Sequence, residues 1–364
     1  MFSCSSDAAP GPHTMHTQAC GCAMPRRGFL KTLAGAAAAS IGAGYSPAYA
    51  QTSPRRIDVH HHFLSPLFAD NARERNIFPP QLKGLSLQVS IDTMDRNGIE
   101  TAMLSLAGPG IWFNDVPLAI KLARDSNEFA ARGRADFKGR FGQFATLPLP
   151  DIDGALKETA YALDVLKTDG VHMWTNYGDK WLGHPHFTPL LEELNRRKAV
   201  AYVHPIAANC CTNLIPEAPG PMIEFGTDTT RTIASLVLSG TTTRFPDIRW
   251  IFSHAGGTMP FLVERFLFQA EVQSRNPEGA KKIPNGVLSE LKRFHYEMAQ
   301  SANVYAVAAL KQLVPTSQIL MGTDYPYRRC DEQVQGLIDT KMFSEAELKA
   351  IGRDNAARLL SMPA

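Results

Sequence analysis

The chain has 364 residues, of which 44% are hydrophobic and 20% are charged, a composition typical of a globular protein. Its formal net charge of +2 arises entirely within the first 50 residues, where Arg26, Arg27 and Lys31 outnumber Asp7. The remainder is neutral, which gives no electrostatic basis for binding nucleic acid or anionic lipid. No long apolar run reaches the ~20 residues that a membrane-spanning helix needs. We therefore expect neither a nucleic-acid nor a membrane partner for the mature chain.

Residues 1–50 have the features of an export signal. Arg26 and Arg27 precede a short apolar stretch rich in alanine and glycine, and "AYA" at 48–50 matches a signal-peptidase site. The paired arginines resemble a Tat signal, with translation starting at either Met1 or Met24. We expect residues 1–50 to be removed, leaving 51–364 as a periplasmic or secreted domain. A disordered basic tail is the alternative.

The mature part of the chain contains three cysteines: Cys210, Cys211 and Cys330. An odd number of cysteines cannot form a complete disulfide framework, so we expect a fold that does not depend on disulfides. For Cys210 and Cys211 we expect two free thiols, with a vicinal disulfide as the alternative.

From residue 55 onward, short β-rich runs alternate with amphipathic helical stretches. In one helical stretch, 85–98, Leu87, Ile91 and Met94 share a face, and Gly98 is a suitable C-terminal stop. Eight strands, each followed by a helix, in about 310 residues predict a single (β/α)8 barrel. A doubly wound α/β fold is the alternative, but no strand is followed by a phosphate-binding glycine motif. The expected strands are 57–62, 101–106, 140–147, 170–174, 200–204, 249–253, 294–298 and 318–322.

Three segments rich in Pro, Gly, Asn and Thr are expected as long connections: 107–116, 205–230 and 271–290. On a barrel, the loops that follow the strands form the catalytic face. Residues with chemical function should therefore gather where the strands end.

Histidines close the first predicted strand, in "IDVHHH" at 57–62. Because side chains alternate along a strand, His60 and His62 point to one side and His61 to the other. Two imidazoles at the C-terminal end of a barrel strand make half of a metal site. Taken alone, such a pair is more often a surface cluster.

Three further strands end in residues that can bind a metal. They are His204 in "AVAYVHPI", His254 in "RWIFSHAGG" and Asp324 in "QILMGTDYPY". Each has an ordinary alternative as a buried, hydrogen-bonded histidine or a helix N-cap. Four such strand ends in one barrel are hard to attribute to coincidence. Three histidines and a carboxylate would suit Zn²⁺, or a harder ion such as Mn²⁺.

The motifs "IDVHHH", "YVHP", "FSHAGG" and "MGTDYPY", in this order and spacing, resemble the amidohydrolase superfamily, from about residue 57 to 360. More narrowly, the chain is similar to the branch of 2-amino-3-carboxymuconate-6-semialdehyde and γ-resorcylate-type decarboxylases. The resemblance implies that His60, His62, His204 and Asp324 hold the metal. It also implies catalytic roles for His254 and Asp324. The fourth strand ends in "GVHMWTN" without a lysine or glutamate, so we expect one ion. No motif for an organic cofactor is visible, and we expect none.

The same resemblance implies a homodimer, because these decarboxylases can supply an arginine to the neighbouring subunit's site. Arg265 is the candidate, with a surface ion pair to Glu264 as the alternative. Trp174 and Asn176 come at and after the end of the fourth strand, and we expect them to contact the substrate, with a packing role as an equal alternative for Trp174.

We therefore predict a metal-dependent, non-oxidative decarboxylase of a small aromatic or unsaturated carboxylic acid. The alternative on the same ligands is a hydrolase, in which metal-activated hydroxide attacks a carbonyl and His254 stabilises the oxyanion. A metal-binding protein without catalysis would leave His254 without a purpose. The loop after the first strand offers Lys83 where the semialdehyde decarboxylase has an arginine, so the substrate stays open.

Overall fold

The computed structural model describes residues 55–212 and 214–362. The predicted export signal at 1–50 lies outside these residues. In the described part, eight strands pair in parallel, each with its neighbour, into one sheet that follows the chain order. They are β1 (Arg56–Phe63), β2 (Ile99–Leu106), β3 (Phe141–Thr146), β4 (Gly170–Trp174), β7 (Val200–His204), β8 (Arg249–Phe252), β9 (His295–Glu297) and β10 (Ile319–Leu320).

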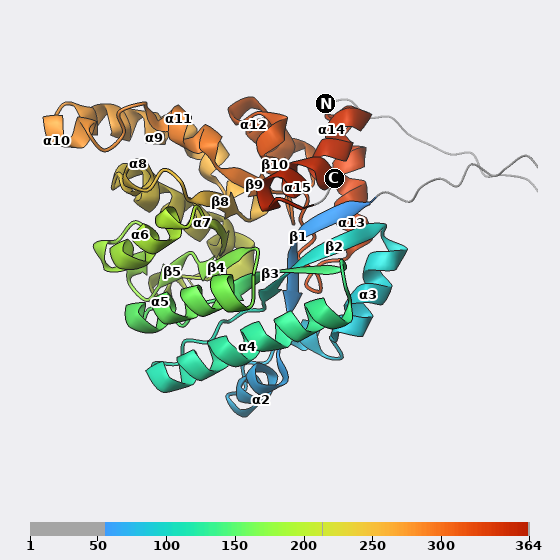
Figure 1. The fold of residues 1–364 in the computed structure, drawn as a ribbon. Helices are drawn as coiled ribbons and strands as arrows, with labels where there is room; N and C mark the ends of the chain where they lie inside the picture. Colours follow the sequence, from blue (N-terminus) through green and yellow to red (C-terminus); the bar gives the residue numbers. More distant parts are fainter. Residues whose placement is uncertain (1–54, 213, 363–364) are drawn as a thin grey trace, which may run out of the picture. The chain divides into compact units, whose positions relative to one another are not determined.

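Helices lie around the outside of these strands (Figure 1). This arrangement confirms the predicted (β/α)8 barrel. The last strand is shorter than the predicted 318–322. The main outer helices are α2 (Pro66–Glu74), α3 (Leu87–Arg96), α4 (Val116–Asp136), α5 (Ile152–Ala160), α6 (Thr188–Arg196), α7 (Gly220–Leu238), α9 (Met259–Ser274), α11 (Val287–Arg293), α12 (Val304–Leu313) and α13 (Cys330–Asp339).

Shorter elements complete the described chain. The hairpin β5 (Asn176–Tyr177) and β6 (Lys180–Trp181) follows β4. The remaining helices and single turns are η1 (Pro80–Leu82), η2 (Tyr161–Val165), η3 (Pro185–Phe187), η4 (Asn209–Cys211), α8 (Thr241–Arg244), η5 (His254–Gly256), α10 (Pro277–Ala280), η6 (Thr316–Gln318), α14 (Glu345–Lys349), η7 (Ala350–Asp354) and α15 (Asn355–Leu360). No helix in the described ranges is both long and apolar enough to cross a membrane.

Two of the predicted connections are partly helical. The segment 205–230 includes the start of α7, and 271–290 includes the end of α9, all of α10 and the start of α11. In both segments a proline that we interpreted as a loop signal lies in the first turn of a helix. Proline is tolerated there because the first backbone N–H groups of a helix have no partner within it.

The barrel interior has an apolar half and a polar half. The apolar half holds Ile57, Val59, Met103, Phe144, Val200, Tyr202, Ile251 and Leu320, and residues of α15 pack against it. The next inward residues along β1 and β7 are histidines, so the polar groups lie at the C-terminal ends of the strands. A second and larger apolar core fills the space between the strands and the outer helices.

The barrel closes where β1 meets the segment after β10. The Asp324 N–H donates to the His60 carbonyl at 2.9 Å, and the His62 N–H donates to the Tyr325 carbonyl at 2.8 Å. These bonds bring an aspartate from the end of the chain beside two histidines from its beginning.

The loop after β7 contains the two adjacent cysteines. Cys210 and Cys211 are joined by a disulfide, whereas we expected two free thiols. Both lie in the single turn η4. Cys330 is a buried free thiol at the start of α13.

Candidate metal centre and active site

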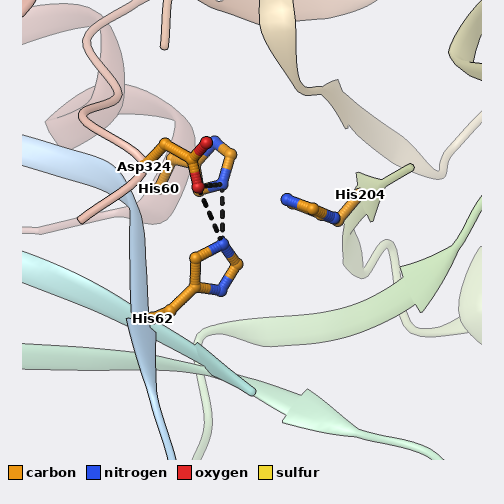
Figure 2. A group of neighbouring side chains, drawn as sticks. All are labelled: His60, His62, His204 and Asp324. Carbon is orange, nitrogen blue, oxygen red and sulfur yellow. Dashed lines mark hydrogen bonds and ion pairs between the residues drawn. The ribbon is translucent and has the colours of Figure 1, made fainter. Parts of the chain in front are cut away.

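Four buried side chains from three strand ends converge at one point. His60 and His62 come from β1, His204 from the end of β7, and Asp324 from the segment after β10 (Figure 2). One potential ligand atom from each residue lies within 4.8 Å of those of the others. These are the four residues that the sequence predicts as metal ligands.

The shortest separations lie between the two β1 histidines and the aspartate. His60 Nε2 is 2.9 Å from His62 Nε2, and Asp324 Oδ1 is 3.1 Å from each of these nitrogens. Asp324 adopts a left-handed backbone with φ 60. Thr323, the residue before it, donates its N–H and its hydroxyl to the buried Asp58 carboxylate at 3.0 and 2.6 Å. Asp58 thus ties the Asp324 turn to β1.

The hydrogen bonds of two ligands determine which ring nitrogen is free. His60 Nδ1 lies 2.8 Å from Glu297 Oε1, and His204 Nδ1 lies 2.8 Å from the carbonyl oxygen of the next residue. A carboxylate and a carbonyl can only accept, so Nδ1 carries the proton in both rings. When the ring is neutral, Nε2 therefore presents the lone pair that a metal ligand must have.

The electrostatics of the group favour a cation. Burial opposes protonation of His60, but the carboxylates of Glu297 and Asp324 outweigh burial and raise the pKa of His60 to about 10. Burial alone would raise the pKa of Asp324, yet His60 and His62 hold it well below its usual range. For His204 burial dominates and lowers the pKa, so this imidazole is neutral at pH 7. Anionic carboxylates beside a neutral imidazole are ordinary ligands of divalent ions.

An unpartnered nitrogen supports the same conclusion. His204 Nε2 is buried and has no hydrogen-bond partner among the described residues. Leaving a buried polar atom unpaired costs about 1–3 kcal/mol, a cost that a bound cation would remove. The donor set and this free nitrogen together fit one divalent ion.

His254 lies beside this group without belonging to it. Its ring centroid is 5.1 Å from that of His60 and 5.6 Å from that of His204. Its Nδ1 donates to the Ala299 carbonyl at 2.9 Å, and its Nε2 is buried without a partner in the described chain. A neutral imidazole with a free Nε2 lone pair can accept a proton and return it.

The predicted substrate contacts differ in their surroundings. Trp174 is 7% exposed and packs edge-on to the His204 ring at 5.4 Å. It also lies against Gly110, where an added Cβ would be 2.6 Å from the indole nitrogen. Asn176 donates its side-chain amide to the Ile206 carbonyl at 3.0 Å and to Asp228 Oδ2 at 2.6 Å. Both amide protons thus serve the scaffold, and contact of either residue with substrate stays a prediction.

Arg265 lies on the exposed side of α9. It forms no hydrogen bond or ion pair with any described residue, so the alternative pairing with Glu264 does not occur. Its predicted contact with a second subunit is addressed below.

Three polar residues of the site escaped the sequence analysis: Glu297, Gln300 and Asp58. Glu297 is fully buried in β9, and Gln300 donates its amide to Asp324 Oδ2. The available signal was a carboxylate within an apolar strand, in "FHYEM" and in "RIDV". His61 is turned away from the metal ligands as predicted, since its ring stacks on Tyr325 at 4.6 Å.

The family model described as Amidohydrolase matches residues 57–362. This chain belongs to the amidohydrolase family. Among amidohydrolase relatives, Decarboxylase yanB of Aspergillus niger is 35% identical, covering 85% of this chain and 89% of its own length. The 6-methylsalicylic acid decarboxylase acuB of Aspergillus aculeatus is 33% identical, covering 74% of this chain and 84% of its own length.

Solved structures share the amidohydrolase barrel. A 2,6-dihydroxybenzoate decarboxylase in complex with 2,6-dihydroxybenzoate superimposes with a TM-score of 0.76 at 23% identity, covering 85% of this chain and 99% of that chain. A 5-carboxyvanillate decarboxylase from Novosphingobium aromaticivorans, in complex with manganese, gives a TM-score of 0.76 at 19% identity. The match covers 86% of this chain and 97% of that chain. At these identities the similarity concerns the fold.

Proposed function

We propose that this amidohydrolase is a metal-dependent, non-oxidative decarboxylase of a hydroxylated aromatic acid. The observation that carries the proposal is the free Nε2 of His254 beside a buried group of three histidines and one aspartate. Relatives named for 6-methylsalicylic and γ-resorcylic acid support the substrate class. Both of these acids carry a hydroxyl group next to the carboxyl group.

Such a substrate can hold the electron pair that the reaction must place. When the ring carbon bearing the carboxylate takes up a proton, the neighbouring phenolate becomes a carbonyl. The bond to the carboxylate then breaks, carbon dioxide leaves, and its electron pair restores the aromatic ring. A bound divalent cation would supply a Lewis acid that holds and polarises the substrate oxygens.

The chain's own residues would move the proton. His254 donates its Nδ1 proton to the Ala299 carbonyl and leaves Nε2 without a partner among the described residues, an arrangement that suits proton transfer. Gln300 holds one oxygen of Asp324 while the other faces the two β1 histidines, so the carboxylate has a fixed orientation. Trp174 would shield one side of the site from water.

One ion per chain is expected. Three nitrogen donors make Zn²⁺ the first candidate. Manganese in the 5-carboxyvanillate decarboxylase structure supports Mn²⁺ as the second. Elemental analysis after purification without chelators measures both the identity and the stoichiometry of the ion.

A hydrolase on the same ligands is the competing function, and isotopes separate the two. Incubation with 6-methylsalicylate or 2,6-dihydroxybenzoate should release one carbon dioxide per phenol formed. Turnover in H₂¹⁸O should place no ¹⁸O in the organic product. An acid product that acquires ¹⁸O from water would instead establish hydrolysis.

We also propose that the protein is a homodimer that pairs through α9. Phe261, Arg265, Phe268 and Val272 lie on one side of this helix, and we call them the α9 face. Phe261 is 86% exposed and Phe268 61%, and Tyr305 on the adjoining α12 is 86% exposed. Exposed aromatic side chains gathered in this way are typical of an association surface.

Two substitutions test the dimer and its arginine separately. Phe261→Asp should give a monomer in light scattering, because it places a charge within the apolar face. Arg265→Ala should remain a dimer with one ion per chain but lose turnover, if the guanidinium binds a carboxylate in the partner's site. Unchanged turnover in that variant would refute the shared site.

The location of the mature protein rests on the export signal alone. We propose a periplasmic or secreted protein whose mature chain begins at Gln51. N-terminal sequencing of the protein from a Tat-competent host tests this, and a chain retaining residues 1–50 would contradict it.

A further inference from the structure

Glu297 holds together the two halves of the candidate active site. Its carboxylate is 0% exposed and lies at the end of β9. Oε1 accepts the Nδ1 proton of His60 at 2.8 Å and the backbone N–H of His254 at 2.8 Å. Oε2 accepts the backbone N–H of Ala299 at 2.7 Å. One side chain thus contacts a metal ligand and the turn that bears the candidate proton carrier.

The contact with Ala299 also reaches the His254 ring. The Ala299 carbonyl accepts the Nδ1 proton of His254 at 2.9 Å, and this proton leaves Nε2 free. Glu297 therefore influences His254 twice, through its backbone N–H and through the residue that fixes its ring. The turn at His254 has a left-handed backbone, with φ 53, so it depends on such external support.

By distance alone, His60, His254 and Glu297 could also hold a metal ion of their own. The hydrogen bonds speak against this interpretation. Oε1 already accepts two donors, and one of them is a backbone N–H that cannot lose its proton. His60 Nε2 belongs to the first group, and His254 Nδ1 is a donor. A second ion would have to displace several of these bonds.

We propose that Glu297 is a positioning residue and not a ligand of a second ion. It keeps the proton of His60 on Nδ1, so that Nε2 is available to a single ion, and it fixes the place of His254 relative to that ion. A carboxylate that orients a ligating histidine typically strengthens metal binding 10–100-fold. This inference rests on the proposed metal-dependent function.

Glu297→Gln is the discriminating variant, because it keeps the size of the side chain. It leaves a single oxygen to accept from the three donors, which are His60 Nδ1–H and the backbone N–H groups of His254 and Ala299. We expect it to bind Zn²⁺ 10–100-fold more weakly in chelator competition, with one ion per chain in the unsubstituted protein. Glu158→Gln is the matched control. Glu158 is also buried but pairs with Arg124 on the outer helix layer, so its replacement should leave the Zn²⁺ affinity unchanged.

Several results would overturn the inference. Zn²⁺ affinity of Glu297→Gln equal to that of the unsubstituted protein would show that Glu297 positions nothing. Two ions in the unsubstituted protein and one in the variant would make Glu297 a ligand. If the unsubstituted protein binds no ion, the proposed function fails as well, whereas equal affinity defeats the inference alone.

A measurement on the unsubstituted, Zn²⁺-loaded protein covers a variant that does not fold. Nitrogen-15 spectra of the histidine rings should show a slowly exchanging proton on His60 Nδ1. A proton on His60 Nε2, or an Nδ1 bound to the metal, would overturn the inference.

Discussion

Gly322→Ala should disturb the metal centre by crowding the Glu297 carboxylate and the Cβ of His60. Gly322 lies between β10 and Asp324, against the Glu297 carboxylate. An added Cβ would overlap Glu297 Oε2 and would lie 2.9 Å from the His60 Cβ. The barrel interior is closed on all sides here, so the carboxylate must move.

The expected cost follows from these contacts. Non-bonded atoms keep about 3.5 Å apart, so the Glu297 carboxylate must shift by more than about 1 Å. Such a shift lengthens the 2.7 Å bond to Ala299 beyond hydrogen-bonding range. A hydrogen bond to a charged group contributes about 1.5–3 kcal/mol, and overpacking a core costs about 1–3 kcal/mol. Gly322→Ala should therefore lower the free energy of unfolding by about 2.5–6 kcal/mol.

Urea unfolding of the metal-free protein and Zn²⁺ titration measure the two consequences. We expect a lower urea midpoint and, in the folded variant, weaker Zn²⁺ binding. Gly226→Ala is the control, because its Cβ would meet only ordinary contacts, at 3.7 Å or more, within helix α7. It should leave both quantities unchanged or raise stability slightly. If Gly322→Ala behaved like this control, the packing argument around Glu297 would be wrong.

Three further predictions concern single histidines. His254→Asn should reduce turnover about 10²–10⁴-fold with the metal content unchanged, since His254 lies outside the group of metal ligands. Loss of the ion in this variant would contradict that placement. His61→Ala should keep the ion but lower the melting temperature, because the His61 ring is buried against Tyr325. His60→Ala should lose the ion, and equal loss of metal in both variants would refute the division into a ligand, His60, and a non-ligand, His61. Burial lowers the pKa of His295 to about 4, so between pH 6.5 and 4 the unfolded chain binds more protons than the folded one. His295 thus contributes up to about 3 kcal/mol to the free energy of unfolding. This contribution is complete above pH 6.5 and is lost as the pH falls toward 4. His295→Asn should flatten the dependence of stability on pH in that range, and an unchanged slope would count against this assignment.

Local rules predicted much of the site from the sequence. Strand alternation separated His60 and His62 from His61, because it depends only on neighbouring residues. The position of His204 and Asp324 at strand ends placed them on the same face of a barrel.

Other features depend on partners far along the chain. Glu297 contacts His60 across 237 residues, and Thr323 contacts Asp58 across 265, so no sequence window contains either pair. The same limit applies to Asn176, whose amide is held by Asp228, 52 residues away, while its contact with substrate stays a prediction. Pro221 and Pro277 suggested loops, because composition alone does not separate a loop from the first turn of a helix.

Titration of the metal-free protein with Mn²⁺ or Zn²⁺, followed by carbon dioxide release from 2,6-dihydroxybenzoate or 6-methylsalicylate, tests the central claim most directly. Turnover should be absent without metal, rise linearly with added ion and reach its maximum at one ion per chain. Carbon dioxide release without metal, or a maximum that requires two ions per chain, would contradict a single-metal decarboxylase.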